Sequence, residues 1–442
     1  MNALSRPILL SGLALAVFCL VPTLSTAADW KGRQETVDGV VQVHNPAEAI
    51  DPAMTIEMEE VFRLGGWDGG DDEFFGIITD IAVGEQGNLY VLDAQLHEVK
   101  IYDAQGNYLN TIGREGEGPG EFRGGTNLFW LPSGDLAVVQ AFPARIVTLK
   151  PDGTPGADFE LETPEGAGFM MVQAIHEAGE NLAVTYSFRE FDQESQEFVA
   201  TTWLSIFDPT SGAEVERLHN HVGGMDFKNP VVSETSFDNF SQRVAVSADG
   251  MIYAPDDLTD YRILAWNPDG TLQRVITREY AVHERTQEEI DELLEIYRGF
   301  TPQGQVPPNT KFEVNDVHPA IDREGLHTRP DGSLWVMTSR GSMEAGDVSL
   351  GTFDVYDPRG RFVRRATLNG QCDNMDDRIM FVGDRIFVVT EFISSAMAAQ
   401  GGGAGAAMDE GEEDAEPMAI ICYRSSDLDR AAGIPDRPAD SR

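Results

Sequence analysis

Residues 78–122 read ITDIAVGEQGNLYVLDAQLHEVKIYDAQGNYLNTIGREGEGPGEF, and the architecture follows from the pattern in this stretch. It holds four short apolar segments, with one turn around Gly87 and another around Gly106. Val, Ile, Leu and Tyr favour strands on a half-buried surface, and Gly accepts the positive φ that tight turns require. The stretch therefore predicts one unit of four antiparallel strands, about the size of a propeller blade.

Both turns recur along the chain. The first turn, in which a strand is followed by a Gly turn and a strongly apolar strand, occurs at 81–93, 128–140, 174–186, 244–256, 326–338 and 379–391. The second turn opens on Asp, Asn or Lys and ends on Gly, and it occurs at 99–109, 146–156, 204–215, 263–275 and 353–363. Six such units predict an all-β fold, a six-bladed β-propeller with four-stranded antiparallel blades and one inserted helix.

The sixth unit has no second turn. Residues 393–417 are rich in Gly and Ala and then acidic, which predicts a disordered loop, and a strand resumes at 419–424. The strand-like segment TIEMEEVFRLGG at 55–66 belongs to no unit of its own. We expect it to supply the missing outer strand of the sixth blade and so to close the ring. A single propeller domain is predicted over 29–425, with a tail at 426–442.

One segment departs from the β pattern. Residues 286–298, TQEEIDELLEIYR, begin with a capping box formed by Thr286 and Glu289 and continue with apolar residues at helical spacing. The sequence predicts an amphipathic helix within an insertion at 281–312. It either packs against the blade edges or forms a lid over one face of the channel.

The first 28 residues have the features of a secretory signal peptide. Arg6 precedes an apolar run at 8–21, and small residues allow cleavage after Ala27 or Ala28. The predicted location is therefore periplasmic or extracellular, with no membrane span and a monomeric state. The net charge of -42 argues against nucleic acid and anionic membranes as partners. It indicates either a solvated acidic surface, which is the preferred interpretation, or attraction of cations or basic partners.

Two cysteines, Cys372 and Cys422, follow the predicted signal peptide. An isolated pair in an oxidising compartment predicts a disulfide. The alternative is a pair of free, buried thiols.

Residues 78–122 also resemble an NHL-type repeat, by the VLD ending of the second strand, the VKIYD third strand and the IGREGEGPGEF connector. Propellers with NHL-like repeats include amidating lyases, lactonase-like hydrolases, antibiotic lyases and plain binding scaffolds. The resemblance implies the propeller, but the fold does not choose among these functions.

Ligands of propellers generally sit at the central channel, where the innermost strands begin. The predicted residues at this channel mouth are Asp80, Asn127, Gln173, Arg243, His327 and Asp377. We expect these side chains to form a polar ligand-binding ring. The alternative is that Asp and Asn simply bind backbone groups at strand starts.

Metal binding is a second possibility at the same place. Asp80, Asn127 and Asp377 offer the oxygen ligands that calcium prefers, although an ion pair of Arg243 with either Asp would argue against a cation there. Zinc is less favoured, because only His176 and His327 fall near inner strands. The sequence contains neither a GxSxG nor an HExxH motif.

The sequence thus predicts an exported scaffold that binds a small molecule or a protein through its channel face, without a cofactor. The alternative is a calcium-dependent hydrolase or lyase of the lactonase or amidating-lyase type. The sequence leaves open whether the protein is an enzyme.

Overall fold

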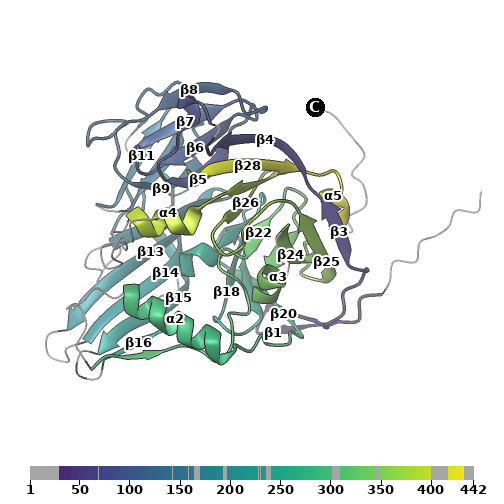
Figure 1. Ribbon diagram of the computed structural model, residues 1–442. Helices are drawn as coiled ribbons and strands as arrows, with labels where there is room; N and C mark the ends of the chain where they lie inside the picture. The colour runs from purple at the N-terminus through teal and green to yellow at the C-terminus, as the bar shows by residue number, and fades with distance from the viewer. Residues whose placement is uncertain are drawn as a thin grey trace, which may run out of the picture.

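The computed structural model describes residues 29–432, except for 68, 142, 158, 164–169, 193–196, 227, 229, 235–239, 301–308, 345, 347 and 400–416. The chain folds into a six-bladed propeller (Figure 1). The innermost strands contact one another in ring order, from β5 through β9, β12, β17, β22 and β26 and back to β5. The predicted signal peptide lies outside the described residues.

The first three blades follow one another directly along the chain. Blade I contains β5 (Ile78–Val83), β6 (Leu89–Asp93), β7 (Glu98–Tyr102) and β8 (Tyr108–Ile112). Blade II contains β9 (Gly125–Trp130), β10 (Leu136–Gln140) and β11 (Arg145–Leu149), with a bridge from Leu149 to Pro155 at its outer edge. Blade III has longer strands, β12 (Met170–Ala178), β13 (Asn181–Asp192), β14 (Glu197–Phe207) and β15 (Glu214–Asp226).

The other three blades also use the N-terminal segment. Blade IV contains β17 (Ala245–Val246), β18 (Ile252–Pro255), β19 (Arg262–Trp266) and β20 (Leu272–Arg278). Blade V contains β22 (Leu326–Thr328), β23 (Leu334–Met337), β24 (Ser349–Tyr356) and β25 (Phe362–Asn369). Blade VI contains β26 (Arg378–Val382), β27 (Arg385–Val389), β28 (Ala419–Arg424) and β4 (Glu59–Gly65).

The N-terminal segment runs along the outer edges of blades IV, V and VI. Its strands are β1 (Arg33–Val37), β2 (Val40–Asn45), β3 (Met54–Glu57) and β4. Strand β2 pairs in parallel with β20, β3 pairs in parallel with β25, and β4 pairs antiparallel with β28. The predicted closing strand at 55–66 is thus split, because only β4 completes blade VI. The remainder covers backbone edges that would otherwise be open to other chains.

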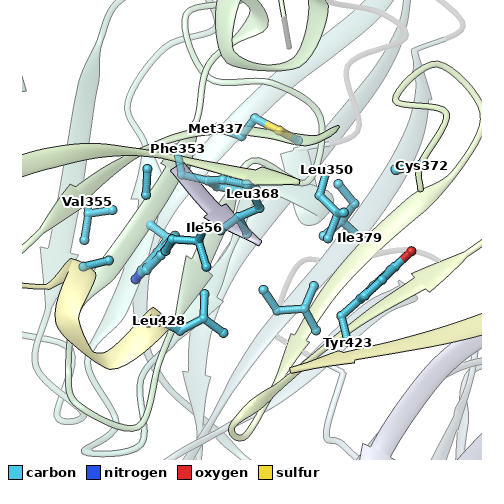
Figure 2. Close-up of a cluster of buried hydrophobic side chains, with 14 of the residues drawn as sticks. Ile56, Met337, Leu350, Phe353, Val355, Leu368, Cys372, Ile379, Tyr423 and Leu428 are labelled. Atoms are coloured by element: carbon cyan, nitrogen blue, oxygen red, sulfur yellow. The ribbon is translucent and has the colours of Figure 1, made fainter. Parts of the chain in front are cut away.

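Apolar clusters fill the spaces between blades. Between blades V and VI, Ile56 of β3 packs against Phe353, Ile379 and Tyr423 (Figure 2). Leu428 of α5 (Leu428–Ala431) joins the same cluster, so the start of the predicted tail packs against the body.

The two cysteines do not form the predicted disulfide. Cys372 and Cys422 are both free and buried. Cys372 packs in the cluster between blades V and VI with Tyr423, whereas Cys422 packs with Phe387 in the cluster between blades VI and I. Because Cys422 and Tyr423 are consecutive on β28, their side chains point to opposite faces of blade VI. The thiols therefore lie on opposite faces, and the alternative of two free thiols is the one observed.

The insertions gather at the end of the propeller where the inner strands begin. They are α2 (Gln287–Phe300), α3 (Ser339–Met343), α4 (Phe392–Ala399), and the parallel pair β16 (Val231–Ser233) with β21 (Lys311–Glu313). The predicted capping box forms, since Thr286 N donates to Glu289 Oε2 at 2.6 Å and Glu289 N donates to Thr286 Oγ1 at 3.3 Å. The prediction of disorder for 393–417 is wrong for the residues that form α4. In this helix, Ser394 N donates a hydrogen bond to Asp376 Oδ1 at 2.7 Å. The rest of that loop, 400–416, lies outside the described residues.

No helix among the described residues is long and apolar enough to cross a membrane.

Candidate functional site

A cavity of about 630 Å³ lies where the inner strands of all six blades converge. Each blade, or the loop that enters it, contributes side chains to the lining. One example from each is, in ring order, Asp80, Asn127, Gln173, Gln242, His327 and Ile379. Four of the six predicted mouth residues, Asp80, Asn127, Gln173 and His327, therefore line one cavity. Its size is that of a small-molecule site.

One arc of the wall consists of Asp80 of blade I and Asn127 of blade II, whose polar side-chain atoms form internal hydrogen bonds that reach blade III. The Asp80 carboxylate accepts from Asn127 Nδ2 at 2.7 Å, from Leu128 N at 2.7 Å and from Ile81 N at 2.9 Å. Asn127 Oδ1 in turn accepts from Ile175 N at 2.9 Å. Burial raises the pKa of Asp80, although the nearby Arg378 and these donors act in the opposite direction. We call these residues the committed arc. Because their hydrogen bonds join three blades, the polar side chains of the committed arc stabilise the fold.

A second arc presents buried polar atoms without hydrogen-bond partners among the described residues. These atoms are Gln173 Oε1, His327 Nε2 and Glu324 Oε1. All three residues line the channel cavity, and His327 is only 8% exposed. The His327 ring stacks on Phe381 with 4.3 Å between ring centroids, which fixes its orientation. We call these three residues the open arc.

The histidines of the cavity are neutral at pH 7. Burial, with a smaller effect of Arg378, lowers the pKa of His327 to about 3 and the pKa of His176 to about 4. A neutral imidazole offers one donor and one acceptor nitrogen. The cavity can therefore bind through either role at His327 without a charge.

Arg378 is the central cation of the cavity, and sequence reasoning missed it. Its Nε donates to Glu324 Oε2 at 2.6 Å, its Nη1 donates to Thr79 O, and its guanidinium lies 5.0 Å from the centroid of the Phe392 ring. Arg378 directly follows the predicted Asp377, so a shift of one residue in the inner-strand register would have found it.

Asp377 and Arg243 are not among the residues that line the channel cavity. Asp377 accepts from the backbone N of Asp373 at 2.8 Å and of Glu391 at 3.1 Å, and it lines a neighbouring pocket beneath α2. Burial raises the pKa of Asp377 to about 6. Arg243 is buried at the end of the 3₁₀ turn η2 (Phe240–Arg243), where its charge acts on Asp322. A cation near Asp80 is Arg378, which was not considered from sequence.

The proposed calcium ligands do not converge. Asp80 and Asn127 bind each other and backbone groups, and Asp377 lines a different pocket. In the described part of the chain, no three His, Cys, Asp or Glu side chains are grouped so that they could hold a metal ion. These residues do not fit a calcium site, because their oxygens already have donors and Arg378 lies beside Asp80.

Comparison with known proteins gives a family match for part of the chain. The model of the family DUF5128, described as 6-bladed beta-propeller, matches residues 69–200. No curated protein sequence is significantly similar to the chain.

The solved structures that are similar to this chain are distant in sequence. A member of the duf4221 family from Bacteroides vulgatus is 9% identical, with 84% of this chain and 98% of that chain covered and a TM-score of 0.46. A gluconolactonase from Xanthomonas campestris is 10% identical, with coverages of 79% and 88% and a TM-score of 0.37. Regucalcin from Agrobacterium tumefaciens, a calcium-binding protein, is 11% identical, with coverages of 85% and 97% and a TM-score of 0.38. The strand topology and the family match together identify the fold of this chain as a six-bladed β-propeller.

Proposed function

We propose that this protein is a binding propeller whose channel cavity takes a small, uncharged ligand that carries hydrogen-bond donors. The observation that carries this proposal is the open arc, with buried polar atoms of Gln173, Glu324 and His327 around one cavity. Buried polar atoms in proteins nearly always have partners, because an unmade hydrogen bond costs about 1–3 kcal/mol. Water would satisfy these atoms in the free protein, and polar groups of a ligand would do so in the complex.

The donors and acceptors of the open arc specify the ligand's polar groups. Gln173 Oε1 and Glu324 Oε1 are acceptors, so they call for O–H or N–H groups on the ligand. The neutral His327 adds a partner of either kind. An anion is disfavoured since Arg378, the cation of the cavity, is already paired with Glu324 and lies near Asp80.

The rest of the wall gives the ligand an apolar contact surface. Leu326, Phe381, Val382 and Phe392 line the same cavity. Apolar and aromatic walls with a few placed polar groups are typical of small-molecule sites. The geometry supports a compact ring with at least two hydroxyl or amide groups.

Resorcinol, a ring with two hydroxyl groups, is the probe for this proposal, and 1,3-dimethoxybenzene is its matched control without donors. We expect titration of the purified protein, followed by nuclear magnetic resonance, to show that resorcinol binds and dimethoxybenzene does not. Gln173→Leu and His327→Phe should each weaken resorcinol binding about tenfold, since each removes one hydrogen bond, worth about 1.4 kcal/mol. Gln86→Leu, in a turn at the opposite end of blade I, serves as the control variant.

Two results would contradict the proposal. One is equal binding of both probes, because donors would then play no part. The other is no binding of either probe, because the cavity would then not take a donor-bearing ring of this size.

A calcium-dependent hydrolase or lyase is the alternative from a different functional class. It needs oxygen ligands that can turn toward an ion, whereas Asp80 and Asn127 already bind backbone N–H groups and each other. We therefore favour binding without a metal.

We also propose that the protein is exported and that its repeat is of the NHL type. Export rests on the signal-peptide pattern of residues 1–28, and the repeat type rests on the 78–122 pattern. A mature N-terminus at residue 28 or 29, measured by intact mass on protein from the native host, is the expected result for export. An uncleaved chain would contradict it.

A further inference from the structure

A second pocket, of about 390 Å³, lies beneath helix α2, beside the channel cavity. It is bounded by α2, the segment before β22, α3, and residues 374–379 before and within β26. Glu324, Arg378 and Ile379 line both cavities, so the Glu324–Arg378 ion pair stands between them. Helix α2 contacts β21, the strand that pairs with β16, and Figure 1 draws α2 near β16.

The roof of this pocket is fixed in place. Arg285, immediately before α2, donates from both Nη atoms to the Glu234 carboxylate at 2.7 Å each. Both side chains are more than nine-tenths buried, and Glu234 Oε2 also accepts from Asn315 N at 3.0 Å. A buried ion pair with two parallel hydrogen bonds has a defined geometry. It therefore fixes the position of the start of α2, which forms the roof of the pocket.

The lining of the pocket is acidic on balance. Five carboxylates line it, those of Glu289, Glu292, Asp322, Glu324 and Asp377. Three arginines also line it, Arg285, Arg323 and Arg378. The charge of Arg285 is neutralised by Glu234, which is outside the lining, and Arg378 pairs with Glu324. Arg323 and the buried Arg243 both act on Asp322. The charge that remains on Glu289, Glu292 and Asp377 is negative, which favours a cationic ligand.

The same pocket has an apolar rim that solvent reaches. Met375 is 74% exposed, Met343 is 43% exposed and Ile296 is 42% exposed, although all three line the pocket. Leu293 of α2 extends this surface. Exposed methionines adapt to apolar partners because their unbranched side chains are flexible and polarisable.

The spacing of the carboxylates separates an organic cation from a metal ion. No three of them, nor any other such set among the described residues, come close enough together to hold a metal. They line one cavity together with apolar side chains. An ammonium group on an apolar chain matches that arrangement, since the charge meets carboxylates while the chain covers Met343, Met375 and Ile296.

We propose that the pocket beneath α2 is a second binding site, for an organic ammonium that carries an apolar chain. The inference goes beyond the proposed function, because it concerns a different cavity and a positively charged ligand instead of an uncharged one. This chemistry has two sources, a free alkylamine or the lysine side chain of a peptide.

Hexylammonium is the test probe, with hexan-1-ol and hexanoate as matched controls that alter only the charged end. Titration of the full chain near pH 7.5, followed by nuclear magnetic resonance, should give a Kd of about 1 mM or lower for hexylammonium. Hexanol should bind at least about fivefold more weakly, and hexanoate should not bind. Nα-acetyl-lysine methylamide and a blocked Ala-Lys-Ala peptide distinguish the two sources. Tighter binding than hexylammonium indicates a peptide lysine, and weaker binding indicates a free alkylamine.

The variants rest on a matched pair of helix residues. Glu292 and Glu295 are both exposed on α2, but only Glu292 lines the pocket. Glu292→Gln should weaken hexylammonium binding about threefold or more, and Met375→Ser should weaken it similarly, whereas Glu295→Gln should have no effect. All three substituted side chains are exposed, so we expect the three variants to fold.

The two sites are tested separately. Gln173→Leu should leave hexylammonium binding unchanged, and Glu292→Gln should leave resorcinol binding unchanged. The second site is overturned if hexanol binds as tightly as hexylammonium, if Glu295→Gln has the effect of Glu292→Gln, or if hexylammonium does not bind. None of these outcomes bears on the channel proposal.

Discussion

The committed arc and the open arc of the channel wall contain the same kinds of side chain but differ in what those side chains contact. In the committed arc, Asp80 and Asn127 use their polar atoms to join blades I, II and III. In the open arc, polar atoms of Gln173, Glu324 and His327 are buried without partners in the described part of the protein. The polar ring at the channel mouth therefore has two parts, one that joins blades and one that we propose to bind a ligand.

The difference teaches that residue type alone does not mark a site. Asp and Asn at strand starts bind backbone groups in many proteins, which was the alternative considered from sequence for Asp80 and Asn127. The useful criterion is whether a buried polar atom already has a partner. Substitution in the committed arc should cost stability, and substitution in the open arc should cost binding.

The largest effect is expected for Asp80→Ala. It leaves the N–H groups of Leu128 and Ile81 and the Asn127 amide without their acceptor, at about 1–3 kcal/mol for each buried group. We expect the free energy of unfolding, from urea titration at pH 7, to fall by about 3–5 kcal/mol. Asn127→Ala should cost less, and the double variant should cost less than the sum, because the two residues interact. Negligible losses would show that this arc does not hold the blades together, and additive losses would show that Asp80 and Asn127 act independently.

An intermediate effect is expected for the pH dependence of stability at His327. Because its folded pKa is lowered to about 3 and its unfolded pKa is about 6.5, only the unfolded state gains a proton between these values. The contribution of neutral, buried His327 to the free energy of unfolding is therefore fully present above pH 6.5, and it is lost as the pH falls toward 3. Each titrating group contributes at most about 1.4 kcal/mol per pH unit.

The comparison is between the wild-type protein and His327→Phe, which keeps a ring to stack on Phe381. From pH 7 to pH 5 the wild-type protein should lose about 2 kcal/mol more than the variant, measured by urea unfolding at each pH. The raised pKa of Asp80 acts in the opposite direction, but it is present in both proteins and cancels in the difference. Parallel curves for the two proteins would mean that His327 is not held neutral by burial.

The smallest effect on stability is expected for Gln173→Leu. Its side-chain oxygen has no partner to lose among the described residues, so an apolar residue of similar size should change the free energy of unfolding by less than about 1 kcal/mol. The measurement is the same urea titration as for Asp80→Ala. A loss as large as that of Asp80→Ala would remove the distinction between the two arcs.

Much of the fold could be predicted from the sequence. The strand–turn–strand units at 81–93 and 99–109 became the hairpins of blade I, with Gly87 and Gly106 at φ of 79° and 88°. The helix at 286–298 was predicted because a capping box and a 3.6-residue period are local signals. The parallel addition of β2 and β3 to blades IV and V was not predicted, because edge pairing across about 230 to 310 residues leaves no local pattern.

The candidate site was predicted in part. Asp80, Asn127, Gln173 and His327 line the cavity as a ring of inner strands requires, whereas Asp377 faces the pocket beneath α2. Arg378 was missed because a shift of one residue on a strand reverses which side chain faces the channel. Glu324 lies in the loop that enters blade V, where no periodicity assigns a direction to its side chain.

The sequence by itself determined the repeats, the turns and the capped helix, because these depend on contacts between residues close together in the chain. Only the tertiary structure decided which blade each N-terminal strand joins, which face of β28 carries Cys422, and which polar atoms of the channel have partners. Those outcomes depend on groups that are distant in sequence and meet only when the ring closes. Local propensity therefore determines the strands and turns of each blade, and closure of the ring determines which side chains line the channel cavity.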